Sequence, residues 1–186
     1  MIDLYREDCE VGLNRMRMAG QAVDIIVTSP PYNIAKDYDT YNDAQPEAQY
    51  SDKLYWILEA CRNVLTSQGS LFLNLGGLPS DPLKPFRILE AVRREWVCQN
   101  VFHWIKSIAI GDTPCVGHVK PVNSERYVNN THEYIFHLTP TGNTPLNKCA
   151  IGVPYADKSN LTRGNRGKNG DLRDRGDQGL EHLLAQ

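Results

Sequence analysis

Six consecutive residues, Thr28-Ser29-Pro30-Pro31-Tyr32-Asn33, combine hydrogen-bond acceptors with an aromatic ring where a short apolar run meets a long polar stretch. The two prolines restrict the backbone, so carbonyl groups and the Tyr32 ring can point outward at little entropic cost on binding. The Ser29 hydroxyl and the Pro30 carbonyl can both accept hydrogen bonds from an amine. Tyr32 can stack on a flat ring, an interaction worth about 1–3 kcal/mol for a nucleobase.

These groups suit the methylation of an exocyclic amine on a nucleobase. The lone pair of such a nitrogen is delocalised into the ring, so the nitrogen attacks poorly until acceptors favour its pyramidal form. The base must also flip out of a duplex and be held. The plainer alternative is that Pro30-Pro31 ends a strand and that Tyr32 packs on the surface. Pro-Pro-Tyr alone favours that alternative, but the apolar run before it and Asn33 after it favour the chemical interpretation.

The flanking sequence predicts an α/β fold in which this hexapeptide ends a strand. Residues 23–27 are mostly β-branched, as expected for a strand buried on both faces. Ligand sites in open α/β sheets gather at the carboxyl ends of strands. Asp8 is a fair N-cap for a helix that ends at Gly20, and Ile2 and Leu4 alternate with polar neighbours as in a short strand.

Further elements are expected along the chain. Residues 33–49 show no period and predict a long loop, which in compact domains is usually functional or disordered. An apolar stripe at helical spacing begins at Tyr50. The remaining predicted elements are strands over residues 71–75, 101–105 and 132–138 and a helix from Pro82 to about Trp96. The last two strands lack a helix between them, which favours an antiparallel finish to a mostly parallel sheet.

Length and composition indicate one globular domain. The 186 residues predict a domain over residues 1–140 and a loop-rich basic segment over 141–186, which serves in target recognition or forms a mobile tail. No apolar run approaches the roughly 20 residues that span a bilayer. The early acids and the missing signal-peptide core lead us to expect a cytoplasmic location. Five cysteines without a Cys-x-x-Cys pair fit reduced thiols, and no metal site is predicted.

The net charge of −2 excludes a uniformly basic coat for nucleic acid. Basic residues instead gather within residues 158–175, where six of them accompany two acids. Such a segment suits contact with a polyanion, but a solvated tail has the same composition. Both interpretations stay open.

Residues 24–33 resemble motif IV of the amino-group DNA methyltransferases, the cytosine-N4 and adenine-N6 family of restriction–modification and related systems. Tyr5-Arg6-Glu7-Asp8-Cys9, followed by a helix, is similar to the segment that precedes motif IV in the permuted group, in which motif IV comes first. The later strands of that group also have similar segments here, in the same order, at residues 69–74, 104–106 and 132–136. The resemblance covers about residues 2–139.

The resemblance implies an incomplete Rossmann-like sheet of the S-adenosylmethionine-dependent methyltransferases. The implied function is site-specific methylation of adenine or cytosine in double-stranded DNA with S-adenosyl-L-methionine as the methyl donor. The implied catalytic residues are Ser29, Pro30, Pro31 and Tyr32, and the implied cofactor-binding residues are Asp8, Cys9 and Thr28. A helix N-cap beside a buried thiol explains Asp8 and Cys9 equally well.

Contacts with DNA are predicted for polar and basic residues in loops. These residues are Asn33, Lys36, Lys120, Ser124, Arg126, Arg163, Arg166 and Lys168. A solvated loop explains them almost as well, so this assignment rests on residue type alone.

The chain departs from the pattern of the permuted group in one respect. The Phe-x-Gly-x-Gly loop that binds the methionine part of the cofactor is missing, because Gly76-Gly77 and residues 164–170 have neither its spacing nor a following helix. The chain therefore resembles a truncated methyltransferase or one part of a split one, and we expect self-association or a complementary cofactor-binding subunit. The alternative is a non-catalytic remnant that binds DNA or a partner. Ser29, where an aspartate is also common, leans only weakly toward cytosine.

Overall fold

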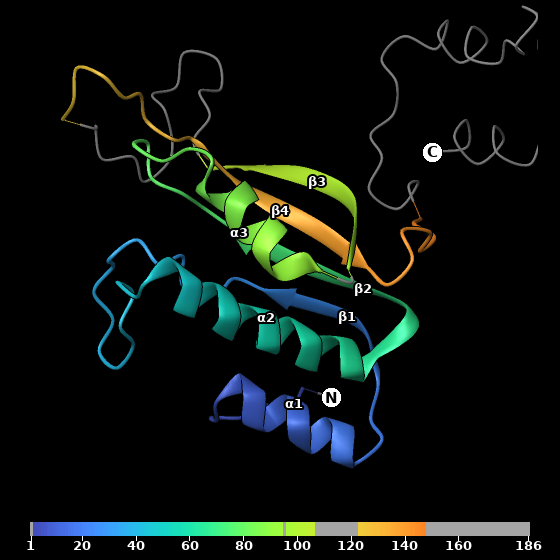
Figure 1. The fold of residues 1–186 in the computed structure, drawn as a ribbon. Coiled ribbons are helices and arrows are strands. Elements are labelled where there is room, and N and C mark those ends of the chain that lie inside the picture. Colours follow the sequence, from blue (N-terminus) through green and yellow to red (C-terminus); the bar gives the residue numbers. More distant parts are fainter. Residues whose placement is uncertain (1, 95, 107–122, 148–186) are drawn as a thin grey trace, which may run out of the picture. The chain divides into compact units, whose positions relative to one another are not determined.

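The computed structural model describes residues 2–94, 96–106 and 123–147, and all its helices and strands lie in a compact unit that ends at Thr144. The order along the chain is α1 (Cys9–Met18), β1 (Val23–Thr28), α2 (Glu47–Val64), β2 (Leu65–Leu75), α3 (Lys84–Arg93), β3 (Val97–Ile105) and β4 (His132–Thr139) (Figure 1). Four of the predicted DNA contacts, Lys120, Arg163, Arg166 and Lys168, lie outside the described residues.

The four strands form one mixed sheet in the order β1-β2-β4-β3. β1 pairs with β2 in parallel, whereas β4 runs antiparallel to both β2 and β3, so three strands share one direction. Thr28 pairs with Leu73, and Leu75 pairs with Tyr134. The carboxyl ends of β1 and β2 therefore meet the start of β4 at the same end of the sheet. The predicted α/β class and antiparallel finish are confirmed.

The core lies between one face of this sheet and the helices α2 and α3. The predicted stripe of α2 is buried, with Tyr50 and Leu58 at most 2% exposed. Together with α3, this stripe packs against alternate residues of β2 and β4. These residues are Leu71, Leu73, Leu75, Phe136 and Leu138. α1 packs beside α2, as Figure 1 shows. The packing of the helices and strands determines where the carboxyl end of β1 lies.

Two predictions about the first residues are wrong. Residues 2–4 form no strand, and Ile2 and Leu4 are 88% and 92% exposed without a partner strand in the described chain. β1 is not buried on both faces, because Ile25 and Val27 are 62% and 75% exposed. Both residues lie on the sheet face opposite the core. A run of β-branched residues has the same sequence pattern in a covered central strand and in this edge strand.

The boundaries of the other elements move by a few residues. β2 begins directly after α2, six residues earlier than predicted, because its first residues extend the ladder with β1. α1 ends next to Gly20, which takes the left-handed conformation (φ 63°) predicted for a glycine stop. No described helix is both long and apolar enough to cross a membrane.

Candidate active site at the carboxyl ends of β1 and β2

The hexapeptide turns away from the sheet directly after Thr28, the last residue of β1. Pro31 is tied to α2, because the Tyr50 hydroxyl donates a hydrogen bond of 2.7 Å to its carbonyl oxygen. Tyr50 is itself 2% exposed, which makes this anchor rigid. The backbone after the strand is therefore held by the packed core and not by the loop alone.

The long loop that follows is organised around the carboxylate of Asp43, which is 3% exposed. Its two oxygens accept hydrogen bonds from the backbone N–H groups of Asn33 (2.8 Å), Ile34 (3.1 Å) and Lys36 (3.0 Å). Asn33 and Ala35 take left-handed conformations, with φ of 56° and 59°. Such residues aim successive N–H groups at one acceptor, as in the nests that bind anions.

Asn33 serves this loop geometry, and its predicted contact with DNA stays a prediction. Its side-chain amide donates to the carbonyl of Gln45 (2.8 Å) and accepts from the N–H of Gln45 (2.7 Å). The ammonium group of Lys84 donates a hydrogen bond to the backbone carbonyl of Asn33. Asn33 is 9% exposed, and Gln45 bonds to both the nitrogen and the oxygen of its amide.

A polar cluster surrounds the hydroxyl of Tyr32. That oxygen lies 3.0 Å from Ser29 Oγ, 2.7 Å from Asn74 Nδ2 and 3.0 Å from Glu133 Oε2. Asn74 Nδ2 also reaches Glu133 Oε2 (2.9 Å) and Ser29 Oγ (3.3 Å). The other carboxylate oxygen of Glu133 pairs with Lys106. Four elements of the sheet region thus meet at the residues that the sequence singled out.

Burial and charge set the protonation states in this cluster. Burial, together with the nearby carboxylate of Glu133, raises the pKa of Tyr32 to about 12, so its hydroxyl keeps its proton at neutral pH. Burial acts to raise the pKa of Glu133, but hydrogen bonds from Lys106, Asn74 and Tyr32 outweigh it and hold that pKa below its usual range. Glu133 is therefore a carboxylate that can only accept hydrogen bonds.

Gly76 allows the Tyr32 ring to lie against the end of β2. A Cβ atom at this position would stand 2.7 Å from Cε2 of the Tyr32 ring and 3.2 Å from Cγ of Glu133. Real Cβ atoms almost never approach another heavy atom to 2.7 Å. One side of the ring is thus fixed by the backbone, which leaves Tyr32 half-buried rather than enclosed in the core.

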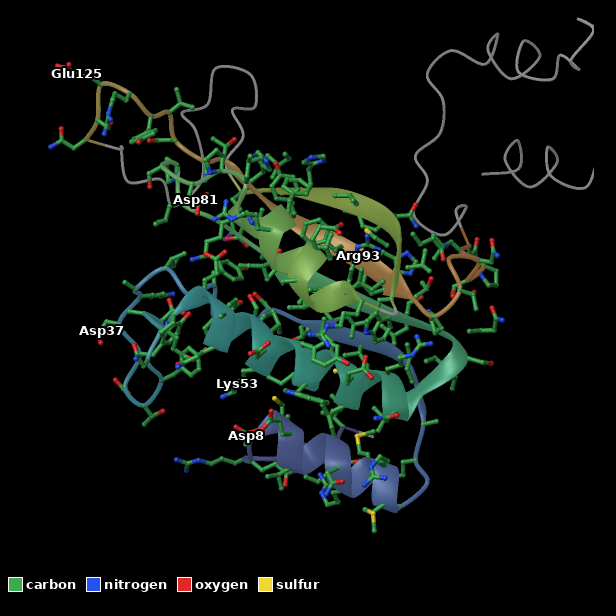
Figure 2. All side chains as sticks on the ribbon, in the orientation of Figure 1. Asp8, Asp37, Lys53, Asp81, Arg93 and Glu125 are labelled. Atoms are coloured by element: carbon green, nitrogen blue, oxygen red, sulfur yellow. The ribbon has the colours of Figure 1, made fainter. Side chains whose placement is uncertain are left out.

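The three residues expected to bind the cofactor line one pocket of about 270 Å³ beside the hexapeptide. Its lining is Asp8, Cys9, Thr28, Pro30, Pro31, Tyr41, Tyr50, Lys53, Leu54 and Ile57. Figure 2 shows Asp8 at the start of α1 and Lys53 on the side of α2 that faces it. Asp8 is also the N-cap of α1, because its side chain accepts a hydrogen bond of 2.9 Å from the N–H of Glu10. Both interpretations of Asp8 are compatible with this geometry.

The thiol of Cys9 has no feature of a nucleophile. Cys9 is exposed, so the expected buried thiol is wrong. Partial desolvation raises the pKa of its thiol, and the neighbouring carboxylates of Asp8 and Glu10 raise it further. The protonated thiol is the poorly reactive form of cysteine. Cys9 is therefore a small apolar wall of the pocket. Within the described part of the chain, no three metal-ligating side chains gather at one point.

The described residues that were predicted to touch DNA lie on two loops. Lys36 is exposed on the loop after the hexapeptide, with its ammonium group 5.3 Å from the centre of the Tyr38 ring. Ser124 and Arg126 are exposed on the loop before β4, where Ser124 Oγ accepts from the N–H of Arg126 (3.1 Å). Figure 2 places Asp37 and Glu125, neighbours of these residues, beyond the same end of the sheet. The two loops therefore flank the polar cluster.

Sequence reasoning missed three members of the cluster, Asn74, Glu133 and Lys106. A signal for Asn74 was present, because it is the next-to-last residue of a strand parallel to β1 and so ends beside it. Glu133 lies 101 residues from Tyr32, and only the antiparallel pairing of β4 brings it to this end of the sheet. The antiparallel direction of the last strand was predicted, but its register was not.

Comparison with known proteins places the chain in a family. The profile of the DNA methylase family, of the N6/N4 type, matches residues 23–177. The chain therefore belongs to the N6/N4 DNA methylase family, and the resemblance to amino-group DNA methyltransferases is confirmed.

Individual relatives agree with this assignment. The type II methyltransferase M.BglII of Bacillus subtilis is 30% identical over 162 residues, which cover 79% of this chain and 39% of M.BglII. The DNA adenine methyltransferase YhdJ of Escherichia coli is 35% identical over 57 residues, or 31% of this chain and 19% of YhdJ. The matched residues thus cover less than half of either relative.

A solved structure agrees at the level of the fold. The crystal structure of M1.HpyAVI superimposes with a TM-score of 0.50 and 17% identity, over 74% of this chain and 55% of that one. The methyltransferase-like fold that the resemblance implied is confirmed.

Proposed function

We propose that this chain carries the target-amine site of a DNA methyltransferase that modifies the exocyclic nitrogen of adenine or cytosine. The observation that carries the proposal is the corner formed by residues 29–32. It places two acceptors and an aromatic ring at the carboxyl ends of adjacent parallel strands, in a chain of the N6/N4 DNA methylase family. Adenine and cytosine both present an amino group, so the geometry supports either target equally.

In this proposal Ser29 Oγ and the Pro30 carbonyl accept hydrogen bonds from the amino group and favour its pyramidal form. The Pro30 carbonyl accepts no hydrogen bond from the described residues, whereas the Pro31 carbonyl is occupied by Tyr50 and serves to hold the corner. Tyr32 stacks on the flipped base with the ring side that does not face Gly76. The nitrogen becomes more acidic as it is methylated, and its proton leaves to solvent.

S-adenosylmethionine, when bound, supplies the electrophilic methyl group. The pocket fits one end of it. Proline, tyrosine, leucine and isoleucine walls suit a flat heteroaromatic ring, and the volume of about 270 Å³ lies just below the roughly 300–1,000 Å³ usual for ligand pockets. We assign the adenine end of the cofactor to Asp8, Cys9 and Thr28. The methionine end would need further polar partners, and the sequence has no Phe-x-Gly-x-Gly loop to provide them.

Double-stranded DNA is the proposed partner, held by the two loops that flank the site. Lys36, Ser124 and Arg126 are suited to contact phosphates, because they are exposed and are basic or hydroxyl-bearing. Lys120, Arg163, Arg166 and Lys168 remain sequence-based proposals for the same role.

The alternative function is a DNA- or partner-binding relative of a methyltransferase that does not catalyse. The absence of a Phe-x-Gly-x-Gly loop from residues 1–186 favours it for this chain by itself. The intact corner and its polar cluster favour the enzyme, because a protein that only binds phosphates has no use for acceptors aimed at an amino group. The two functions therefore differ in whether binding depends on that group.

The open edge of the sheet supports a second protein as partner. β1 pairs with β2 alone in the described chain, and its outer residues Ile25 and Val27 are exposed. A parallel strand with unpaired backbone groups and apolar side chains invites another strand. We propose that a complementary cofactor-binding subunit, or a second copy of this chain, covers this edge.

The proposed function is tested by the affinity of the chain for single-stranded thymidine oligonucleotides that carry one different base. Single strands remove the cost of base flipping, and the thymidine background contains no amino group. We expect deoxycytidine to bind more tightly than deoxyuridine, and deoxyadenosine more tightly than deoxyinosine. The difference should be about 1–3 kcal/mol, because a carbonyl oxygen would face Ser29 and Pro30. Equal affinities would refute the amine site and favour the non-catalytic alternative.

A further inference from the structure

The hydrogen atoms of the polar cluster can be assigned by counting donors and acceptors. Glu133 is ionised and only accepts, so the hydrogen atom of the Tyr32 hydroxyl must point to Glu133 Oε2, 3.0 Å away. Asn74 Nδ2, at 2.7 Å, donates to the same hydroxyl oxygen. Tyr32 then has no hydrogen left for Ser29. The contact of 3.0 Å between the two hydroxyls is therefore a hydrogen bond that Ser29 donates.

The consequence falls on Ser29 Oγ. A serine hydroxyl has one hydrogen and two acceptor positions. The hydrogen is directed to Tyr32. Asn74 Nδ2 has two hydrogens and lies nearer to Tyr32 and Glu133, so its contact with Ser29 at 3.3 Å takes up at most one acceptor position. One acceptor position remains, and Ser29 is exposed at the end of the strand. The chain of hydrogen bonds from Ser29 through Tyr32 to Glu133 thus presents Ser29 outward as an acceptor.

Asn74 is oriented by the same carboxylate. Its Nδ2 contacts Glu133 Oε2 at 2.9 Å, and turning the amide over would place an oxygen against that charge. Asn74 Oδ1 is buried and accepts no hydrogen bond from the described residues. A buried acceptor without a partner is uncommon and is typical of functional sites. The amide is therefore held in the orientation in which Nδ2 donates to the cluster, although Oδ1 then has no donor among the described residues.

We infer that Glu133 is a positioning residue that acts through Tyr32 and Asn74 to keep Ser29 Oγ an acceptor for the target amine. The inference rests on the proposed function, since it names the group that sets the polarity of the same site. Glu133 does not touch the base. It fixes which partner of each hydrogen bond carries the hydrogen, and Lys106 holds its second oxygen.

The substitution Glu133→Gln separates this role from a merely structural one. Lys106 can only donate, so the glutamine oxygen stays with Lys106 and the glutamine NH₂ group turns toward Tyr32. The Tyr32 hydrogen then turns to Ser29 or to Asn74 Oδ1, because no charge now keeps the Asn74 amide from turning over. Where it turns to Ser29, the Ser29 hydrogen is driven outward and opposes the amino group. Shape and packing are preserved, but the direction of the hydrogen bond between Tyr32 and Ser29 is reversed.

The experiment uses the thymidine oligonucleotides with a single deoxycytidine or deoxyuridine and measures the ratio of the two affinities. The wild type should prefer deoxycytidine roughly fivefold or more. Glu133→Gln should lose or invert that preference. Glu90→Gln is the matched control, because Glu90 also pairs with a basic side chain but its own side chain is 65% exposed on α3. It should keep the wild-type ratio.

A double variant sharpens the test. With Lys106→Met added to Glu133→Gln, the glutamine is free to turn its oxygen to Tyr32, and the preference for deoxycytidine should return. A purely structural role predicts further damage instead. Carbon-13 NMR of labelled tyrosine gives a second readout. Glu133→Gln should lower the pKa of Tyr32, because the charge of Glu133 raises it, while burial, the larger cause, keeps it above the ordinary value.

The outcomes distinguish the two levels of the proposal. A wild type without preference for deoxycytidine refutes the proposed function itself. A wild type with that preference and a folded Glu133→Gln that retains it overturns the role of Glu133 and leaves the proposed function standing. If Glu133→Gln loses its cooperative thermal transition, Glu133→Ala takes its place. The alanine removes the carboxylate that draws the Tyr32 hydrogen away from Ser29 and holds the Asn74 amide, so the preference should weaken.

Discussion

Asp43→Asn should open the loop that follows the hexapeptide without unfolding the domain. The carboxylate accepts three backbone hydrogen bonds at 2.8 to 3.1 Å and is 3% exposed. An asparagine must turn its NH₂ group toward at least one of these N–H groups. That loses one bond to a charged group, worth about 1.5–3 kcal/mol, and weakens the other two by about 1 kcal/mol each. The sum is about 3.5–5 kcal/mol against the closed loop.

The assay is amide hydrogen exchange at Asn33 and Ile34. Because each 1.4 kcal/mol is a factor of ten, their exchange should accelerate roughly 300- to 4,000-fold. The amides of the core strand β2 should keep their wild-type protection. Asp39→Asn is the matched control, an exposed aspartate of the same loop that should change nothing. Wild-type exchange at Asn33 in a folded Asp43→Asn variant would refute the reasoning that one carboxylate organises the loop.

The other predictions concern the site, its pH dependence and its partners. Tyr32→Ala should lose the preference for amino-bearing bases and keep a cooperative thermal transition, since the ring is only half-buried; loss of the transition would make Tyr32 structural. The depressed pKa of Glu133 stabilises the fold above the unfolded-state pKa of about 4.3, and this contribution is lost as the pH falls through the folded-state value. The difference in unfolding free energy between wild type and Glu133→Gln should therefore be constant at neutral pH and shrink on acidification, whereas a difference that grows would contradict the assignment. Calorimetric titration of this 186-residue chain should show S-adenosylmethionine binding weaker than micromolar, because the pocket fits only one end of the cofactor; micromolar affinity would show that the pocket is complete. Light scattering at low micromolar concentration, with and without high salt, should show self-association through the open edge of β1, and a clean monomer at every concentration would mean that the chain covers its own edge.

The parts of the fold that the sequence predicted are those with a local cause. The stripe of α2, the N-cap Asp8 and the stop at Gly20 each depend on residues within one or two turns, and each lies where it was expected. The hexapeptide also lies where expected, because two prolines must end a strand. The pairing of Asp8 and Thr28 in one pocket followed from the family resemblance and not from any local pattern.

The features that sequence reasoning missed depend on strand register and on which faces of the sheet other elements cover. Whether β1 is covered on its outer face depends on what packs there, and its β-branched run is the same in either case. The partners of Tyr32 lie 42 and 101 residues away on β2 and β4. A shift of β4 by one residue would turn Glu133 to the opposite face of the sheet. Asn33 was expected outside, because an asparagine in a loop does not reveal that its amide will meet Gln45.

The central claim is that residues 29–32 form the amine site of a methyltransferase, and the most direct test supplies the rest of an enzyme. In a chimera, this chain would replace the segment of M.BglII to which it is 30% identical. The measurement is mass spectrometry of nucleosides from DNA incubated with the chimera and S-adenosylmethionine. We expect a methyl group on the exocyclic nitrogen of adenine or cytosine, and we expect Tyr32→Ala to abolish it. A folded chimera that binds DNA and cofactor but leaves both amines unmethylated, or methylates a ring carbon, would contradict the account.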